Sequence, residues 1–269
     1  MNILLLICFF LVILTLYLHI IKEFSYSENL NVYETDFIND KNFNKICSLQ
    51  QPFIMYLDMN CEYVIEKEVE LNVKDICDNE MVSLSYDSFD NLLDQNKDYY
   101  SDNNHDFVIM NLKTNYSDFD LILRPYLNMN TKYDYLSGSS LVKTNTKYHT
   151  SSRLFLYVKK GSITVKFACW KSRELFGPFI DYDNLNLLTE KNIWDVCDDT
   201  ISIEVKEGHI LFIPPYWFYS IQFNEKSEVL YFEYQTMINF ILNSHHLCLH
   251  YLQSSNINSK VLEYANLII

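Results

Sequence analysis

The sequence predicts a mainly β fold, a sandwich or barrel with flanking helices, preceded by one membrane-spanning helix. After residue 105, many short apolar segments separated by turn residues follow one another, as is typical of sandwiches and barrels. Two of these segments, 201–205 and 217–223, place an apolar residue at every second position, which indicates half-buried strands. The membrane helix is predicted by an almost wholly apolar run over residues 3–21.

Composition excludes some functions. The 269 residues carry a formal net charge of −14 and no basic stripe, which argues against nucleic acid as a partner. The seven cysteines form no CxxC pair, so zinc spacing is absent; free thiols are expected, and pairing stays an alternative. Abundant Asn, Ile, Tyr and Lys are typical of AT-rich genomes, as in some protists and large DNA viruses.

Residues 1–22 are predicted to be a transmembrane anchor. About 20 apolar residues cross a bilayer as a helix. No Lys or Arg precedes the run and no small-residue cleavage site follows it, so an uncleaved anchor is favoured over a signal peptide. The membrane is therefore an expected partner, and the expected localisation is single-pass membrane.

The rest of the chain divides into a connector (23–49), a domain (50–235) and a C-terminal helical segment (236–269). Within the domain we expect a first strand at 50–57 and a surface loop at 87–106, with at most one helical turn. Further strands are predicted, with 119–127 ambiguous between strand and helix, and 152–160 and 161–170 forming a hairpin at Lys160-Gly161. Their remaining ranges are 106–112, 200–205, 209–214, 216–223 and 228–235. A helix is predicted over 236–253.

Three quoted stretches, in this order, carry a family resemblance: "SLQQPFIM" (48–55), "SGSSLVKTNTKYHTSSRLFLYVKKGSITVKF" (137–167) and "EGHILFIPPYWFYSI" (207–221). In the last, five residues separate Gly208 from Pro214, the spacing of the second cupin motif. The chain resembles the JmjC and cupin-like family, in the style of its asparaginyl-hydroxylase-type branch. The resemblance implies a double-stranded β-helix (jelly-roll or cupin) fold. It also implies that the helix at 236–253 can support a homodimer, because C-terminal helices often do so in this family.

The same resemblance implies an iron site that has lost ligands. The family holds Fe(II) with two histidines and one carboxylate. His149 stands at the first histidine, Ser151 replaces the aspartate and Tyr219 replaces the second histidine. A serine hydroxyl is a poor Fe(II) ligand, and tyrosine binds iron only as phenolate. The degenerate site therefore keeps one of three ligands.

The co-substrate groups are also incomplete. Thr146 matches a threonine that binds 2-oxoglutarate in this branch. Ile163 occupies the position of the family's lysine, and Lys166 is the nearest basic residue along that strand. Thr146 and Lys166 are therefore the candidate cofactor-binding residues.

These residues favour a membrane-anchored, catalytically inactive domain that binds or scaffolds a protein partner, with no cofactor. One alternative is an Fe(II)- and 2-oxoglutarate-dependent protein hydroxylase with displaced ligands, for instance His149 with His209 or Glu204. Another is a metal-free pocket for a small molecule or a sugar. Fold-level analogy leaves all three open.

Overall fold

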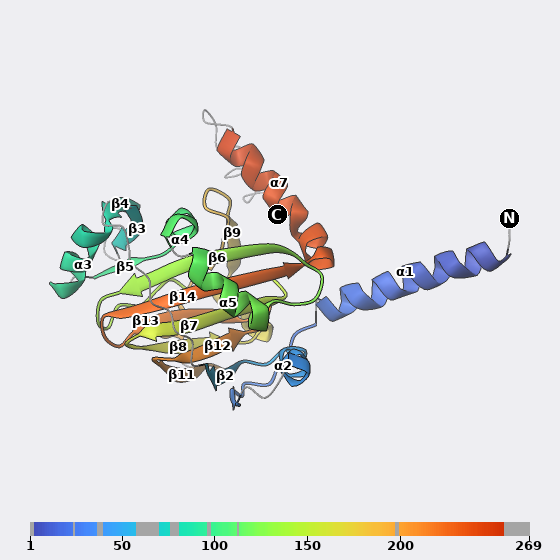
Figure 1. The fold of residues 1–269 in the computed structure, drawn as a ribbon, viewed down its shortest axis with the longest axis horizontal. Helices are drawn as coiled ribbons and strands as arrows, with labels where there is room; N and C mark the ends of the chain where they lie inside the picture. The colour runs from blue at the N-terminus through green and yellow to red at the C-terminus, as the bar shows by residue number, and fades with distance from the viewer. Residues whose placement is uncertain are drawn as a thin grey trace.

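The computed structural model describes residues 3–23, 25–36, 40–57, 70–75, 81–95, 98–111, 113–196 and 199–255. Its largest element is a nine-stranded sheet (Figure 1). In spatial order its strands are β1 (Tyr33–Glu34), β2 (Phe53–Tyr56), β12 (His209–Ile213), β7 (Arg153–Lys160), β14 (Ser227–Thr236), β6 (Asn128–Gly138), β5 (Tyr99–Ser101), β3 (Glu70–Asp75) and β4 (Met81–Ser85).

A smaller sheet packs against one face of the large one. It has three strands, β11 (Ile201–Lys206), β8 (Ser162–Ala168) and β13 (Phe218–Phe223). Side chains from both sheets share one apolar core, in which Leu156 of β7 meets the layer containing Val165 of β8 and Phe223 of β13. A separate two-stranded hairpin is formed by β9 (Pro178–Asp181) and β10 (Asn186–Thr189).

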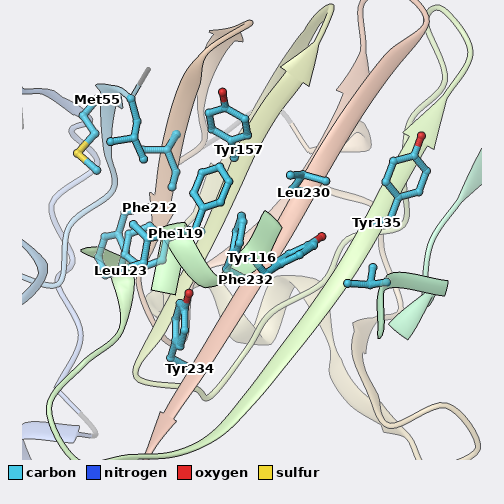
Figure 2. Close-up of a cluster of buried hydrophobic side chains, with 14 of the residues drawn as sticks. Met55, Tyr116, Phe119, Leu123, Tyr135, Tyr157, Phe212, Leu230, Phe232 and Tyr234 are labelled. Atoms are coloured by element: carbon cyan, nitrogen blue, oxygen red, sulfur yellow. The ribbon is translucent and has the colours of Figure 1, made fainter. Parts of the chain in front are cut away.

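Helices cover the other face of the nine-stranded sheet. They are α2 (Asp40–Cys47), α3 (Tyr86–Asp94), α4 (His105–Asn111) and α5 (Lys113–Leu123). Figure 2 shows Tyr116 and Phe119 of α5 gathered with Phe232 of β14. Because successive side chains of a strand point to opposite faces, each central strand supplies both cores. In β7, Phe155 joins the helical core while Leu156 joins the core between the sheets.

The predicted fold class is wrong. The described residues contain seven α-helices around the large sheet, so the protein is mixed α/β rather than a mainly β double-stranded β-helix. The error arises chiefly between residues 86 and 123. The expected loop at 87–106 contains α3 and the short strand β5, and the expected strand at 106–112 coincides with α4.

The physical reason is helical spacing within those segments. Phe89 and Leu93 stand four residues apart and are both buried, as are the adjacent Phe107 and Val108 on α4. Residues four apart lie on one helix face, so these segments bury a stripe against the sheet rather than alternating across it. The ambiguous 119–127 segment contains the end of helix α5.

The N-terminal helix α1 spans Ile3–Glu23 and extends away from the sheets (Figure 1). A helix crosses a bilayer only if it is both long and predominantly apolar. Within the described part of the chain, no helix meets both conditions. The predicted transmembrane anchor at 1–22 and the single-pass membrane localisation are therefore wrong.

The remaining strand predictions match the structure except in how one pair is joined. Strands β7 and β8 meet at Gly161, whose φ of 78° suits the tight turn. They do not form the predicted hairpin, because β7 pairs with β12 and β14 while β8 pairs with β11 and β13. The turn thus carries the chain from one sheet to the other. The predicted C-terminal helix is α7 (Met237–Ser255).

Candidate ligand-binding pocket

A cavity of about 120 Å³ lies between the two sheets. Its floor comes from β6 and β14 of the nine-stranded sheet, and β13 of the smaller sheet supplies the opposite wall. The segment 144–150 forms one side, and the β9–β10 hairpin and α7 contribute residues at the rim. Six parts of the chain, spread from β6 to α7, therefore build one pocket.

The floor is a ladder of polar side chains. Strands β6 and β14 are antiparallel, so residues that face each other across the pair share a face of the sheet. Three such pairs line the cavity: Asn130 with Gln235, Lys132 with Glu233, and Asp134 with Tyr231.

Glu233 is the centre of this floor. Its carboxylate accepts hydrogen bonds from the Ser151 hydroxyl and, at 2.7 Å, from the Tyr231 hydroxyl. Gln235 in turn donates to Ser151 Oγ at 3.1 Å. Burial alone would raise the pKa of Glu233, but the nearby charge of Lys132 and the two hydroxyl donors more than offset it and hold that pKa below its ordinary value.

Tyr219 extends this network from the opposite sheet. It is buried and lines the cavity, close enough to Glu233 and Tyr231 for both to act on its pKa. Burial, and then the Glu233 charge, raise the pKa of both phenols, so both are neutral at physiological pH.

His149 is held in one orientation by the turn after β12. Its Nε2 lies 3.0 Å from the carbonyl oxygen of Ile213, and since a carbonyl only accepts, Nε2 carries the proton. The amide of Tyr216 donates back to the His149 carbonyl at 2.9 Å. Tyr216 has φ 61°, a left-handed conformation that costs on the order of 1 kcal/mol. The residue that donates this hydrogen bond to His149 is therefore in a strained backbone conformation.

The other ring nitrogen of His149 is left without a partner. The residue is only 3% exposed and lines the cavity, yet its Nδ1 makes no hydrogen bond. Burial lowers the pKa of His149, more than the Glu233 charge raises it, so the ring is neutral and Nδ1 bears a free lone pair. An unpaired buried acceptor of this kind opposes folding by about 1–3 kcal/mol.

Two other charged groups of the lining, Lys147 and Asp134, have partners of their own. Lys147 Nζ lies 2.6 Å from Asp102, and although burial alone would lower the pKa of Lys147, this carboxylate more than offsets it. The carboxylate of Asp134 accepts from the backbone amides of Asn103 and Asn104, at 3.0 and 2.6 Å. These contacts fix the charges in place beneath the cavity.

The two candidate cofactor residues lie elsewhere. Thr146 Oγ1 accepts from the backbone amide of Ile193 at 2.7 Å and donates to Asn192, so it anchors the short helix at 193–195. Lys166 Nζ donates to the carbonyl of Val196 at 2.7 Å and lies over the Trp194 ring. Neither side chain lines the cavity.

The three degenerate ligand positions, by contrast, come together around Glu233. The Ser151 hydroxyl donates a hydrogen bond to that carboxylate. The negative charge of Glu233 acts on the pKa values of both His149 and Tyr219. The donor set does not fit Fe(II), because Ser151 is neutral and already donating and Tyr219 is held as a neutral phenol, so only the His149 imidazole is left among the three positions. Among the described residues, no three His, Cys, Asp or Glu side chains are grouped as a metal site requires.

The displaced-ligand alternatives lie outside the cavity lining. His209 starts β12, where its ring packs 5.3 Å from that of Tyr56 and its Nδ1 bonds the Glu207 carbonyl. Glu204 lies on β11 with an exposed side chain. Neither is placed to complete a site with His149.

Sequence reasoning misses Glu233, Lys132 and Lys147. The available signal for Glu233 is alternation: in "EVLYFEYQ" Glu233 and Gln235 are polar, while Phe232 and Tyr234 on the other face are aromatic. Nothing in the sequence indicates that Lys132 stands opposite Glu233, because their pairing depends on strand register.

The rim joins α7 to the β9–β10 hairpin. His246 Nδ1 lies 3.2 Å from the Tyr182 hydroxyl, and His250 Nδ1 lies 2.7 Å from the Tyr182 carbonyl. Asn243 of α7 and Asn186 of the hairpin line the cavity from these two sides. The rim therefore adds amide groups, which both donate and accept.

Comparison of the chain with models of known protein families finds no match, and comparison with curated proteins finds none either. The resemblance to the JmjC and cupin-like family thus stays a prediction that rests on the quoted residues.

Proposed function

We propose that this protein is a non-catalytic binding module that holds a small molecule, without a metal, in the pocket between its two sheets. The observation that carries the proposal is the cavity itself, which brings Lys132, Glu233 and Gln235 of the large sheet against Tyr219 of the smaller one. Enclosed pockets with a few convergent polar groups are where proteins bind small molecules.

The composition of the lining supports the same function. Ligand pockets combine apolar walls with a few fixed polar groups. Leu136 and Ile221 supply apolar wall, and Tyr231 and Glu233 are fixed by hydrogen bonds before any ligand arrives. Such prior ordering lowers the entropic cost of binding.

Catalysis by iron and 2-oxoglutarate has less support. Of the residues that the resemblance assigns to iron, Ser151 is used as a donor to Glu233, and His149 uses Nε2 to hold a backbone carbonyl. We expect no stoichiometric iron after anaerobic Fe(II) loading and no conversion of 2-oxoglutarate to succinate. Succinate formation that depends on His149 would instead establish the hydroxylase alternative.

Binding itself is tested by ligand-observed NMR on the full chain, with a panel of small polyols, amines and carboxylates. We expect at least one panel member to bind the wild type and to be lost in Gln235→Trp, which fills the cavity from its floor. The matched control is Gln222→Trp, on a strand facing the same cavity but with a side chain outside its lining. If no molecule binds, or if both variants bind alike, the proposal is wrong.

A further inference from the structure

The lysines and acids of the pocket lining fall into two groups. Lys147 is ion-paired with Asp102, and the Asp134 carboxylate accepts from backbone amides. Lys132 and Glu233 form the other group, and they face each other across the β6–β14 strand pair on the side that lines the cavity. These two are therefore the charges that a ligand in the cavity would meet.

Lys132 has no partner of its own. In the part of the chain that the structure describes, its ammonium group forms no ion pair and no hydrogen bond, although its charge acts on Glu233. The residue is partly buried, so the ammonium has lost some of its hydration without compensation. A carboxylate group on a ligand would supply both the opposite charge and the acceptors that this ammonium lacks.

Glu233 can bind a cationic group in the same cavity. Burial alone would raise its pKa, but the Lys132 charge and the two hydroxyl donors hold that pKa below its ordinary value, so the carboxylate is ionised at neutral pH. A carboxylate offers roughly four acceptor positions. The Ser151 and Tyr231 hydroxyls use one on each oxygen, so each oxygen can accept one further hydrogen bond.

The size and walls of the cavity limit the ligand further. A cavity of about 150 Å³ holds one benzene molecule, so a volume of about 120 Å³ admits a molecule of roughly five to seven non-hydrogen atoms. Leu136 and Ile221 can pack against its carbon atoms. The ligand is therefore short enough for its two ends to meet two side chains that stand opposite each other on neighbouring strands.

From these observations we infer that the pocket binds a small amino acid as its zwitterion, with the carboxylate on Lys132 and the ammonium on Glu233. Such a ligand matches both charges at once. A simple anion would leave Glu233 facing a like charge, and a simple cation would do the same to Lys132, which is costly in a buried site. This inference rests on the proposed binding function and specifies its ligand class.

The test uses three probes of one carbon skeleton and different charge: alanine, lactate and alaninol. Lactate replaces the ammonium of alanine by a hydroxyl group, and alaninol replaces its carboxylate by a hydroxymethyl group. Each is titrated into the full chain by ligand-observed NMR. We expect alanine to bind with a Kd on the order of 0.1–1 mM, and lactate and alaninol to bind at least about tenfold more weakly. Binding of alanine should be lost in Gln235→Trp and retained in Gln222→Trp.

Variants of Lys132 test which group meets the carboxylate. Lys132→Met keeps the length of the side chain without its charge, and we expect alanine to bind about ten- to a hundredfold more weakly while alaninol binds no more weakly than before. Lys132→Arg should retain most of the affinity for alanine. The matched control is Lys160→Met, an exposed position outside the lining, which should change neither.

The outcomes separate the ligand class from the binding function. Lactate or alaninol binding as tightly as alanine would overturn the zwitterion while leaving the binding function intact, and so would binding by a polyol but not by alanine. Equal weakening of alanine and alaninol in Lys132→Met would also overturn the inference. Failure of these probes and of the whole NMR panel to bind would refute the binding function itself.

Discussion

Strand β14 has two faces of opposite chemistry. Its alternate side chains enter either the helical core or the pocket; they are Leu230, Phe232 and Tyr234 on the first face, and Tyr231, Glu233 and Gln235 on the second. The first face is fully buried among aromatic rings, as Figure 2 shows around Phe232. The second is partly buried, polar and bonded across to the segment that contains Ser151.

The difference shows where stability and binding reside. Apolar packing on the helical face contributes most per side chain, because it removes large rings from water. On the pocket side, Glu233 and the unpaired His149 Nδ1 are removed from water. The free-energy cost of that desolvation opposes folding. Proteins retain such local costs mainly at functional sites. One strand therefore serves as scaffold and as binding surface.

Removing packing on the helical face should have the largest effect on stability. The Phe232 ring centroid lies 4.8 Å from that of Tyr116 and 4.7 Å from that of Phe119. We expect Phe232→Ala to lower the free energy of unfolding by about 3–5 kcal/mol. Urea denaturation measures the loss, with Gln235→Ala on the opposite face as the matched control. Equal losses in the two variants would contradict the distinction between the faces.

A smaller loss of stability is expected where β6 of the large sheet packs against β13 of the smaller sheet. A Cβ added at Gly138 of β6 would lie 2.3 Å from Cδ2 of Phe223 on β13. Gly138→Ala should therefore cost about 1–3 kcal/mol through overpacking. Denaturation of the double variant Gly138→Ala with Phe223→Leu is the control, because a smaller side chain should restore part of the loss. No restoration would mean that the two sheets do not meet here as described.

The smallest effect concerns pH and the pocket face. Burial lowers the pKa of His149 below its ordinary 6.5, so below that pH the unfolded chain takes up a proton that the folded chain does not. Stability from this residue is thus present above pH 6.5 and is lost as pH falls, by at most about 1.4 kcal/mol per pH unit. The lowered pKa of Glu233 gives a loss in the same direction, but only below its ordinary 4.5.

Between about pH 5 and 8 the unfolding free energy reports His149 together with His246, whose pKa is lowered by burial and then by the His245 charge. We expect His149→Gln to flatten the pH dependence in this window relative to the wild type, since both proteins keep His246. An unchanged slope in His149→Gln would show that His149 is not buried as a neutral ring.

Much of the β core could be predicted, because its strands combine alternation with clear turns. The segments 201–205 and 217–223 coincide with β11 and β13, and the predicted helix at 236–253 overlaps α7. The region 86–123 could not be predicted as well. Its helices are short, and their apolar stripes are stabilised by the sheet beneath them rather than by their own propensity.

The candidate site shows the same division. His149, Ser151 and Tyr219 were singled out by resemblance, and they do lie around one point. The resemblance did not single out Glu233, the residue that these three surround. Thr146 and Lys166 were chosen for their positions in a motif, but their side chains bond the segment around 192–196 instead.

By itself, the sequence determined which strands alternate between buried and exposed side chains and where the turns fall. It also showed that Pro214-Pro215 ends β12 and that an aromatic run follows. Only the tertiary structure decided that Lys132 faces Glu233, that Tyr219 reaches Tyr231 from another sheet, and that His149 keeps one nitrogen unpaired. The physical reason is that alternation is a local property of each strand. Register and sheet packing depend on contacts between residues far apart in the chain.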